Sequence, residues 1–266
     1  MLQQTQVERV VPAFERFVAA FPDFASLAEA SRADVVRAWK GLGYNSRAVR
    51  LHELARAVRE RRGGVLPSDE AALRALPGVG PYTARAIRAF AFGAPAVALD
   101  TNVRRVVHRT QLGLEHPPRA GERELDALAA GLLPAGRAFA FNSALMDLGA
   151  TICTARSPKC GDCPLRSLCA AAPVDAARLA RLAAKVVASK PSRQRVPFEA
   201  TSRYARGRVV DSLRALPAAG AISLLDLRAE LAGLAEREGD AVGDAVRTLE
   251  RDGVLERLGD AVRLRI

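Results

Sequence analysis

Four cysteines stand close together in the chain, and their spacing predicts a metal centre. They follow one another as C-x6-C-x2-C-x5-C and are Cys153, Cys160, Cys163 and Cys169. Four thiolates on one short loop can hold a [4Fe-4S] cluster, and a metal is favoured over two disulfides in a reducing compartment. A structural zinc ion is the alternative, although zinc sites usually pair two C-x2-C units and only one such unit occurs here.

A glycine-rich turn forms a second candidate site. The stretch LPGVG, at residues 76–80, lies between two segments with helical spacing. Gly78 and Gly80 allow a sharp turn that aims consecutive backbone N–H groups, including that of Val79, outward ahead of a helix. Such a turn can bind a DNA phosphate without reading sequence. The alternative is an ordinary hairpin between two core helices.

A single aspartate follows that turn after twenty residues. Asp100 precedes the arginine-rich segment NVRRVVHR, which has helical spacing. An aspartate in this place commonly caps the helix through its side chain. A capping carboxylate can also act in catalysis, so the two interpretations are compatible.

The overall charge indicates a polyanionic partner. The 266 residues include 40 Lys and Arg against 29 Asp and Glu, which gives a net charge of +11. Nucleic acid is the usual partner of so basic a chain, while a compositional bias toward arginine is the alternative. No segment has the length and apolarity of a membrane span, and no signal peptide is recognisable. A cytoplasmic location is therefore expected.

The elements that position these residues are predicted to be mainly α-helical. Helical segments broken by Pro and Gly fill residues 1–97, and a second helical region covers residues 98–175. Residues 176–200 are rich in Ala, basic residues and Pro, and are interpreted as a linker. Residues 201–266 predict three helices and then two apolar runs joined at Gly259, the pattern of a small winged helix.

The motifs taken together resemble a known family. LPGVGPYTARAI, then LDTNVRRV, then the cysteine pattern resemble the helix-hairpin-helix DNA glycosylase superfamily. MLQQTQV, GLGYNSRA and NSALMDLGATIC are similar to its MutY-type adenine glycosylase branch. The resemblance implies a six-helix barrel with the helix-hairpin-helix over residues 1–97 and an iron-sulfur helical domain over 98–175. It also favours the [4Fe-4S] cluster over zinc.

The resemblance implies a catalytic set. Enzymes of this branch remove adenine mispaired with 8-oxoguanine or guanine in double-stranded DNA, after flipping it out of the duplex. Asp100 would stabilise the oxocarbenium-like centre at C1′. Tyr82 stands where the endonuclease III branch has a Schiff-base lysine, so a monofunctional glycosylase is implied. Asn102 would support the same pocket.

The resemblance also implies residues that contact DNA. Gln3 and Gln4 would enter the duplex at the lesion, and Tyr44 would wedge beside the opposite purine. The turn at Gly78, Val79 and Gly80 would hold a phosphate. Several basic residues would add phosphate contacts, although solvated helix faces are the alternative for each: Arg104, Arg105, Arg109, Lys159 and Arg166. The protein is expected to act as a monomer.

The chain departs from the family pattern in three places. The family's general acid is a Glu two residues before the Met of the MLQQTQ motif, and that Met is residue 1 here, so an upstream segment is expected. Glu8 is no substitute, because it would lie roughly 15 Å farther along a helix. Asn45 and Ser46 replace a second aromatic residue. Residues 201–266 do not resemble the family's nudix-like domain, which leaves the preference for 8-oxoguanine over guanine open.

Two alternatives to adenine release remain. A mismatch thymine glycosylase of the same superfamily can share Tyr82 and Asp100, and base release from A:G and T:G duplexes separates the two. A catalytically silent iron-sulfur protein that binds DNA is the second, suggested by the missing Glu. Both alternatives retain the cluster and DNA as partner.

Overall fold

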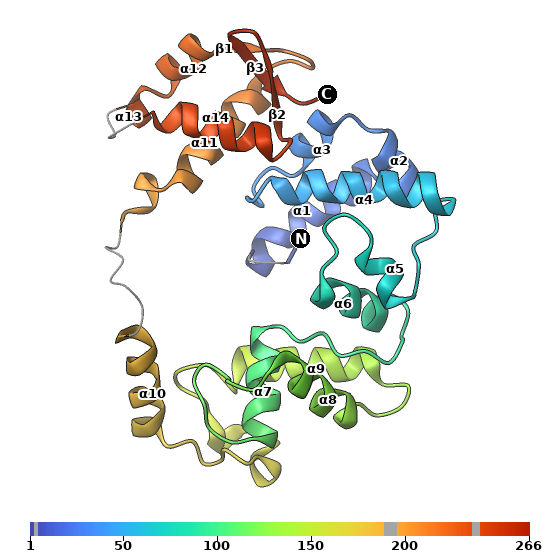
Figure 1. Ribbon diagram of the computed structural model, residues 1–266, viewed down its shortest axis with the longest axis vertical. Helices are drawn as coiled ribbons and strands as arrows, with labels where there is room; N and C mark the ends of the chain where they lie inside the picture. The colour runs from blue at the N-terminus through green and yellow to red at the C-terminus, as the bar shows by residue number, and fades with distance from the viewer. Residues whose placement is uncertain (3–4, 189–195, 236–239) are drawn as a thin grey trace. The chain divides into compact units, whose positions relative to one another are not determined.

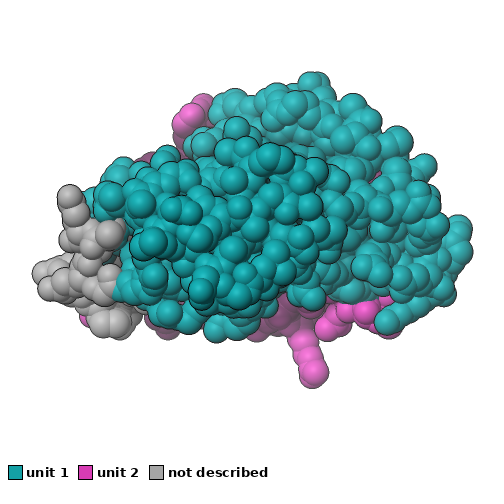
Figure 2. Space-filling model, turned by 90° about the horizontal axis from the view of Figure 1, so that it is seen from above, with its two compact units in different colours: residues 1–66, 76–78, 194–266 teal, residues 67–75, 79–193 magenta. Residues whose placement is uncertain are grey.

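The computed structural model describes four stretches of the chain: residues 1–2, 5–188, 196–235 and 240–266 (Figure 1). The chain forms two compact units. The first contains residues 1–66, 76–78 and 194–266, and the second contains residues 67–75 and 79–193 (Figure 2). Helices dominate both units, which confirms the predicted mainly α fold class. Within the described ranges, no helix has the length and apolarity to cross a membrane.

The first unit begins with four helices: α1 (Val7–Ala20), α2 (Phe24–Glu29), α3 (Arg32–Ala38) and α4 (Ser46–Arg62). Side-chain caps fix where the short ones start. The Asp23 carboxylate accepts a hydrogen bond from the Ser26 backbone N–H at 2.7 Å and caps α2, while Ser31 caps α3. Gly63, with φ +60°, ends α4 in the left-handed conformation that glycine tolerates.

The C-terminal part of the first unit combines short helices with a small sheet. Its elements are η3 (Phe198–Ala200), α11 (Ser202–Ala215), β1 (Ile222–Ser223), α12 (Leu224–Glu230), α13 (Ala232–Ala235), α14 (Ala241–Arg251), β2 (Leu255–Leu258) and β3 (Ala261–Leu264). The predicted hairpin is confirmed, since β2 and β3 pair antiparallel around Gly259, which has φ +60°. The two-residue strand β1 pairs with β3, and this gives the sheet order β1-β3-β2. This arrangement matches the predicted winged helix, with one strand more than the sequence indicated.

One hydrophobic core joins the two ends of the chain in this unit. Val10, Phe17 and Trp39 from the N-terminal helices belong to the same buried cluster as Val209 and Val246 from the C-terminal helices. The predicted boundaries at residues 97 and 200 therefore do not follow the packing of the chain. A pattern of local helices cannot reveal such pairing, because the partners lie about two hundred residues apart.

The second unit carries α5 (Glu70–Arg74), α6 (Pro81–Ala91), α7 (Thr101–Gln111), α8 (Glu122–Leu132), α9 (Ala138–Thr151), η1 (Cys160–Asp162), η2 (Arg166–Leu168) and α10 (Ala176–Ala188). Its main core lies among α7, α8 and α9, where Val103, Val107 and Leu125 are fully buried. Helix α7 packs on both α8 and α9. It is the central helix of this unit.

The predicted linker is wrong over its first half. Residues 176–188 form α10, and the Asp175 carboxylate accepts from the Arg178 backbone N–H at 2.9 Å at its start. Leu179, only 1% exposed, packs in a small cluster with Leu114 and Ala171. Apolar residues spaced for one helix face were therefore the signal to follow, rather than the basic composition. Residues 189–195 of the predicted linker lie outside the described residues, and residues 196–200 lie inside them.

Candidate active site and cysteine cluster

The glycine-rich turn lies between α5 and α6, as predicted (Figure 1). Gly78 has φ +75°, and a Cβ atom there would lie 2.9 Å from the Cβ of Arg50. Gly80 is the N-cap of α6, with Pro81 at its first position. The Val79 side chain is 8% exposed. Its side chain therefore anchors the turn, and only its backbone is suited to hold a phosphate.

Asp100 caps α7 directly. Its Oδ1 atom accepts a hydrogen bond from the Val103 backbone N–H at 2.7 Å. The cap places the carboxylate at the positive end of the helix dipole, which stabilises a negative charge. The cap occupies one carboxylate oxygen, so the predicted capping role leaves chemistry at the other oxygen feasible.

Tyr82 lies within electrostatic range of Asp100. It is the second residue of α6 and belongs to the same unit as α7. Burial raises the pKa of the Tyr82 phenol, and the neighbouring Asp100 carboxylate raises it further. Tyr82 therefore stays protonated at neutral pH and can donate a hydrogen bond.

Two arginines of α7 fix the loop that leads to the cysteines. Arg105 donates to the carbonyls of Gly149 at 2.6 Å and Cys153 at 2.7 Å. Arg109 donates to the carbonyls of Thr154 at 2.7 Å and Ala155 at 3.0 Å. The exposed fractions are 6% for Arg105 and 1% for Arg109. The predicted phosphate contacts of these two residues are therefore wrong, because their guanidinium groups are buried against the protein's own backbone.

The other predicted basic contacts differ in exposure. Arg104 is half-buried on α7, while Lys159 and Arg166 are exposed near the cysteines. Their contacts with phosphate stay predictions.

Asn102 of α7 lies close to Gly149 of α9. Its Oδ1 accepts from the Arg105 guanidinium at 2.9 Å. A Cβ atom at Gly149 of α9 would lie 2.7 Å from the Asn102 Cβ, so only glycine fits there without a shift. In the structure Asn102 thus orients Arg105, and its predicted support of a catalytic pocket stays a prediction.

Asn142 is a positioning residue that sequence reasoning missed. It is fully buried on α9, its Oδ1 accepts from the Ala98 backbone N–H at 2.8 Å, and its Nδ2 donates to the Ala96 carbonyl at 2.9 Å. Nδ2 also donates to the Ala138 carbonyl at 2.8 Å. These bonds fix the segment that enters Asp100. The motif NSALMDLGATIC contains Asn142, but nothing local indicates its distant partners.

The four cysteines line a single cavity next to α7 and α9. None of them forms a disulfide. Burial raises the pKa of the Cys169 thiol, while the backbone N–H groups of Ala171 and Ala172 favour its thiolate. The Arg109 guanidinium lies 3.5 Å from the Cys153 sulfur and offers positive charge to a set of thiolates. Four sulfur donors, backbone N–H groups and a buried cation together fit a [4Fe-4S] cluster.

Tyr44 belongs to the first unit, in the loop between α3 and α4. It has φ +46°, a strained conformation for a residue other than glycine, and its exposed fraction is 38%. The Arg47 and Arg203 guanidinium groups lie 5.6 and 4.8 Å from the centre of its ring. Gln3 and Gln4 lie outside the described residues.

Comparison with known proteins identifies the family. Residues 1–130 match the HhH-GPD superfamily of base excision DNA repair proteins, and residues 153–169 match the iron-sulfur binding domain of endonuclease III. An adenine DNA glycosylase of Mycolicibacterium smegmatis is 45% identical over 214 residues, which cover 80% of this chain and 69% of that protein. The chain belongs to the adenine DNA glycosylase family.

Other members of the family and two solved structures are also similar to this chain. The adenine DNA glycosylase of Mycobacterium tuberculosis is 44% identical over 81% of this chain and 68% of its own. The human one is 43% identical over 64% of this chain and 32% of its own. A thermostable thymine-DNA glycosylase (TM-score 0.59, 34% identity) and an endonuclease III trapped in a covalent intermediate with DNA (TM-score 0.56, 25% identity) each cover 63% of this chain and 78% of their own.

These matches confirm the predicted family and cofactor. The iron-sulfur match begins at Cys153 and ends at Cys169, so it contains all four cysteines. The chain thus carries a [4Fe-4S] binding domain, and zinc is set aside. DNA repair as the setting of the family is likewise confirmed.

Proposed function

We propose that this chain is a monofunctional DNA glycosylase that hydrolyses the N-glycosidic bond of adenine mispaired with 8-oxoguanine or guanine. The observation that carries this proposal is the pair formed by Tyr82 and Asp100, a half-buried, protonated phenol within electrostatic range of a capping carboxylate. A phenol cannot form the Schiff base that a lysine forms in this place, so the pair suits hydrolysis without strand cleavage.

The pair has a direct role in base release. The bond between C1′ and the base breaks, its electron pair leaves with the base, and positive charge develops at the sugar. The Asp100 carboxylate stabilises that charge, a water oxygen then bonds to C1′, and the proton released by that water neutralises the departing adenine. Tyr82 donates a hydrogen bond toward Asp100 or the sugar, and Asn102 supports the pocket. Asn142 and Arg105 keep the segment before α7 and the start of the cysteine loop in place.

DNA is held by groups that do not read sequence. The backbone N–H groups of Gly78, Val79 and Gly80 bind one phosphate, and Arg104 binds another. Gln3, Gln4 and Tyr44 enter the duplex where the adenine leaves the stack. A single chain suffices for these contacts, so the protein acts as a monomer on mispaired duplex DNA.

The four cysteines bind a cluster whose role is structural. A bound [4Fe-4S] cluster would join four thiolates and is capable of electron exchange. Base release transfers no electrons, so Cys153, Cys160, Cys163 and Cys169 serve to order the loop next to α7. Iron and sulfide analysis, with absorbance near 400 nm, tests this assignment.

Thymine release is the second candidate. It is favoured by the structural match to a thymine-DNA glycosylase at 34% identity. Binding without catalysis is the third, and it predicts that DNA is bound while no base leaves. The relatives named adenine DNA glycosylase, with higher identity over more of the chain, support the first candidate.

Single-turnover release of adenine from A:8-oxoguanine and A:G duplexes tests the proposal, with a T:G duplex beside them. The chain is assayed from Met1 and in a second version to which an N-terminal segment with a glutamate two residues before Met1 has been added. Asp100→Asn should reduce release by about 10²- to 10³-fold, because it removes the stabilising charge. Asparagine caps helices as well as aspartate, so α7 should remain intact by circular dichroism.

Two outcomes would contradict adenine release, and a third would contradict the proposed role of Asp100. Release of thymine alone selects the second candidate. Duplex binding with no release by either version selects the third. Equal release by the wild type and Asp100→Asn removes the proposed carboxylate from the mechanism.

A further inference from the structure

An open cavity of about 920 Å³ lies in the first unit, between the loop at residues 41–46 and helix α11. Its volume is in the range of ligand-binding pockets. Five arginines but only two carboxylates are among its lining residues, which leaves an excess of three positive charges: Arg9, Arg203, Arg206, Arg208 and Arg214 against Asp211 and Asp252. The cavity therefore favours an anionic ligand.

Two of these arginines have structural partners. Arg206 forms an ion pair with Asp252. Arg214 donates to the Val36 carbonyl at 2.8 Å and to the Asn45 side-chain oxygen at 2.9 Å. Both therefore hold α11 in place and are not available to a ligand.

The exposed arginines of the cavity have no such partners. Arg203 and Arg208 are exposed on α11, and no carboxylate in the described part of the chain lies within ion-pair distance of either guanidinium. The Arg203 guanidinium lies 4.8 Å from the centre of the Tyr44 ring. A cation is thus presented beside an exposed aromatic ring, a combination that suits a phosphate next to a base.

Helix α11 also fixes the loop that carries Tyr44. Asn45, the next residue, is 8% exposed and accepts its hydrogen bond from Arg214. The C-terminal helices therefore contribute to the conformation of this loop.

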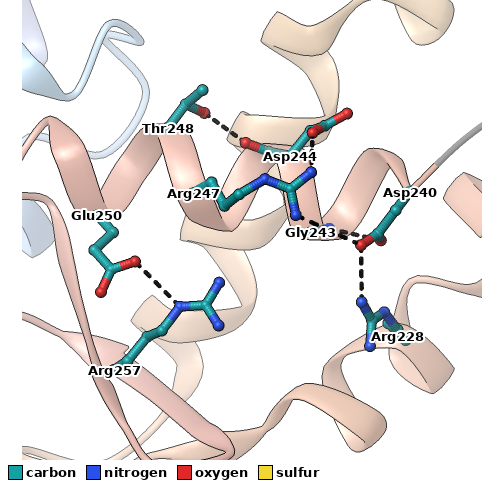
Figure 3. A network of polar contacts seen from close by, with 8 residues as sticks. All are labelled: Arg228, Asp240, Gly243, Asp244, Arg247, Thr248, Glu250 and Arg257. Carbon is teal, nitrogen blue, oxygen red and sulfur yellow. Dashed lines mark hydrogen bonds and ion pairs between the residues drawn. The ribbon is translucent and has the colours of Figure 1, made fainter.

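Three arginines on other elements of the C-terminal module (residues 196–266) are paired with carboxylates. Figure 3 shows this network, in which Arg228 contacts Asp240 at 2.9 Å, Arg247 pairs with Asp244, and Arg257 contacts Glu250 at 3.1 Å. None of these three arginines lines the cavity. Arg203 and Arg208 thus differ from these three arginines, which neighbouring carboxylates neutralise.

We propose that this cavity is a DNA-strand site, in which Arg203 and Arg208 of the C-terminal module bind backbone phosphates beside the base that contacts Tyr44. The C-terminal module thereby takes part in DNA binding directly. This inference rests on the proposed function and deepens it, because it assigns the module a place beside the strand that carries the mispaired purine.

Salt-dependent binding tests the proposal. The probe is a short duplex with 8-oxoguanine opposite a 2′-fluoro adenosine, whose glycosidic bond resists cleavage. For the full chain, Arg203→Ala with Arg208→Ala should weaken binding at least about tenfold at low salt. The same double variant should reduce the slope of log K against log salt by about 1.8, since each phosphate contact contributes about 0.9.

A matched control removes the same charge from the same module. Arg228→Ala with Arg247→Ala deletes two exposed, paired arginines and should leave the slope unchanged. Arg203→Lys with Arg208→Lys keeps the charge and should keep most of the slope. The proposal is overturned if the alanine pair leaves the slope unchanged, or if the control lowers it equally.

Failure of this inference is distinguishable from failure of the proposed function. An unchanged slope with normal adenine release would contradict DNA binding at the cavity and would not affect the proposed glycosylase activity. A reduced slope with no adenine release by either version would support DNA binding at the cavity and contradict the proposed glycosylase activity.

Discussion

Two arginines of α7 and two arginines of α11 differ in what their guanidinium groups contact. On α7, Arg105 and Arg109 are buried and donate to backbone carbonyls of the segment around Cys153. On α11, Arg203 and Arg208 are exposed at an open cavity. A buried guanidinium must be satisfied by the protein itself, whereas an exposed one can exchange water for a ligand phosphate. The same residue type thus fixes a site in one region and offers one in the other.

We expect the largest effect from a substitution of a buried arginine on α7. Arg109→Ala removes two charged hydrogen bonds and leaves the carbonyls of Thr154 and Ala155 without their donor. We expect the free energy of unfolding to fall by about 3–5 kcal/mol, with loss of iron from the preparation. Urea unfolding and iron content per chain measure both.

The matched variant on α11 is Arg203→Ala. Because Arg203 is exposed, its loss should change the free energy of unfolding by less than about 0.5 kcal/mol. Similar destabilisation by the two substitutions would show that burial does not separate these two groups of arginines.

Local patterns in the sequence predicted the parts of the site that depend on neighbouring residues. The cap at Asp100 depends on a contact three positions away, and the turn at Gly78 depends on the positive φ of one residue. The four cysteines lie within one stretch of seventeen residues. The hairpin at Gly259 is of the same kind. A residue's type and its immediate neighbours suffice for such features.

Features that depend on distant partners could not be predicted. Arg109 contacts carbonyls about 45 positions away, and Arg214 contacts Asn45 across 169 positions. An arginine in a helix normally indicates a solvated face, so the sequence pointed away from burial. Asn142 was overlooked for the same reason, since its partners at residues 96 and 98 precede it by more than forty positions.

A second pair of variants places an alanine at a glycine on each side of the comparison, one at the contact of α9 with α7 and one on α11. Gly149→Ala places a Cβ atom 2.7 Å from the Asn102 Cβ and 3.2 Å from the Asn102 backbone, so α7 and α9 must separate. We expect a loss of about 1–3 kcal/mol in the free energy of unfolding. Thermal or urea unfolding measures it.

Gly207 of α11 provides the opposite case. A Cβ atom there meets nothing within 4 Å, and the residue lies inside a helix. Gly207→Ala should therefore stabilise the protein by about 0.5–1 kcal/mol. Destabilisation by both alanines would indicate that the α11 side is packed as tightly as the α7 side.

The smallest expected effect is a shift in the titration of Tyr82. Its pKa is raised by burial and by the Asp100 carboxylate, so the folded protein holds this proton above the ordinary value of about 10. A raised folded pKa contributes stability that is present below the unfolded pKa and is lost as pH rises through the folded pKa. In Tyr82→Phe the free energy of unfolding should therefore fall less steeply as the pH rises into the alkaline range. Urea unfolding over a pH series measures this.

The same titration tests whether Asp100 and Tyr82 act as a pair. Asp100→Asn removes one cause of the raised pKa while burial remains, so the Tyr82 phenol should ionise at lower pH than in the wild type but still above an ordinary tyrosine. Ultraviolet absorbance of tyrosinate, with Tyr82→Phe to identify the step, follows this directly. An unchanged titration in Asp100→Asn would mean that the carboxylate does not influence the phenol, and the pair that carries the proposed chemistry would then lose its physical basis.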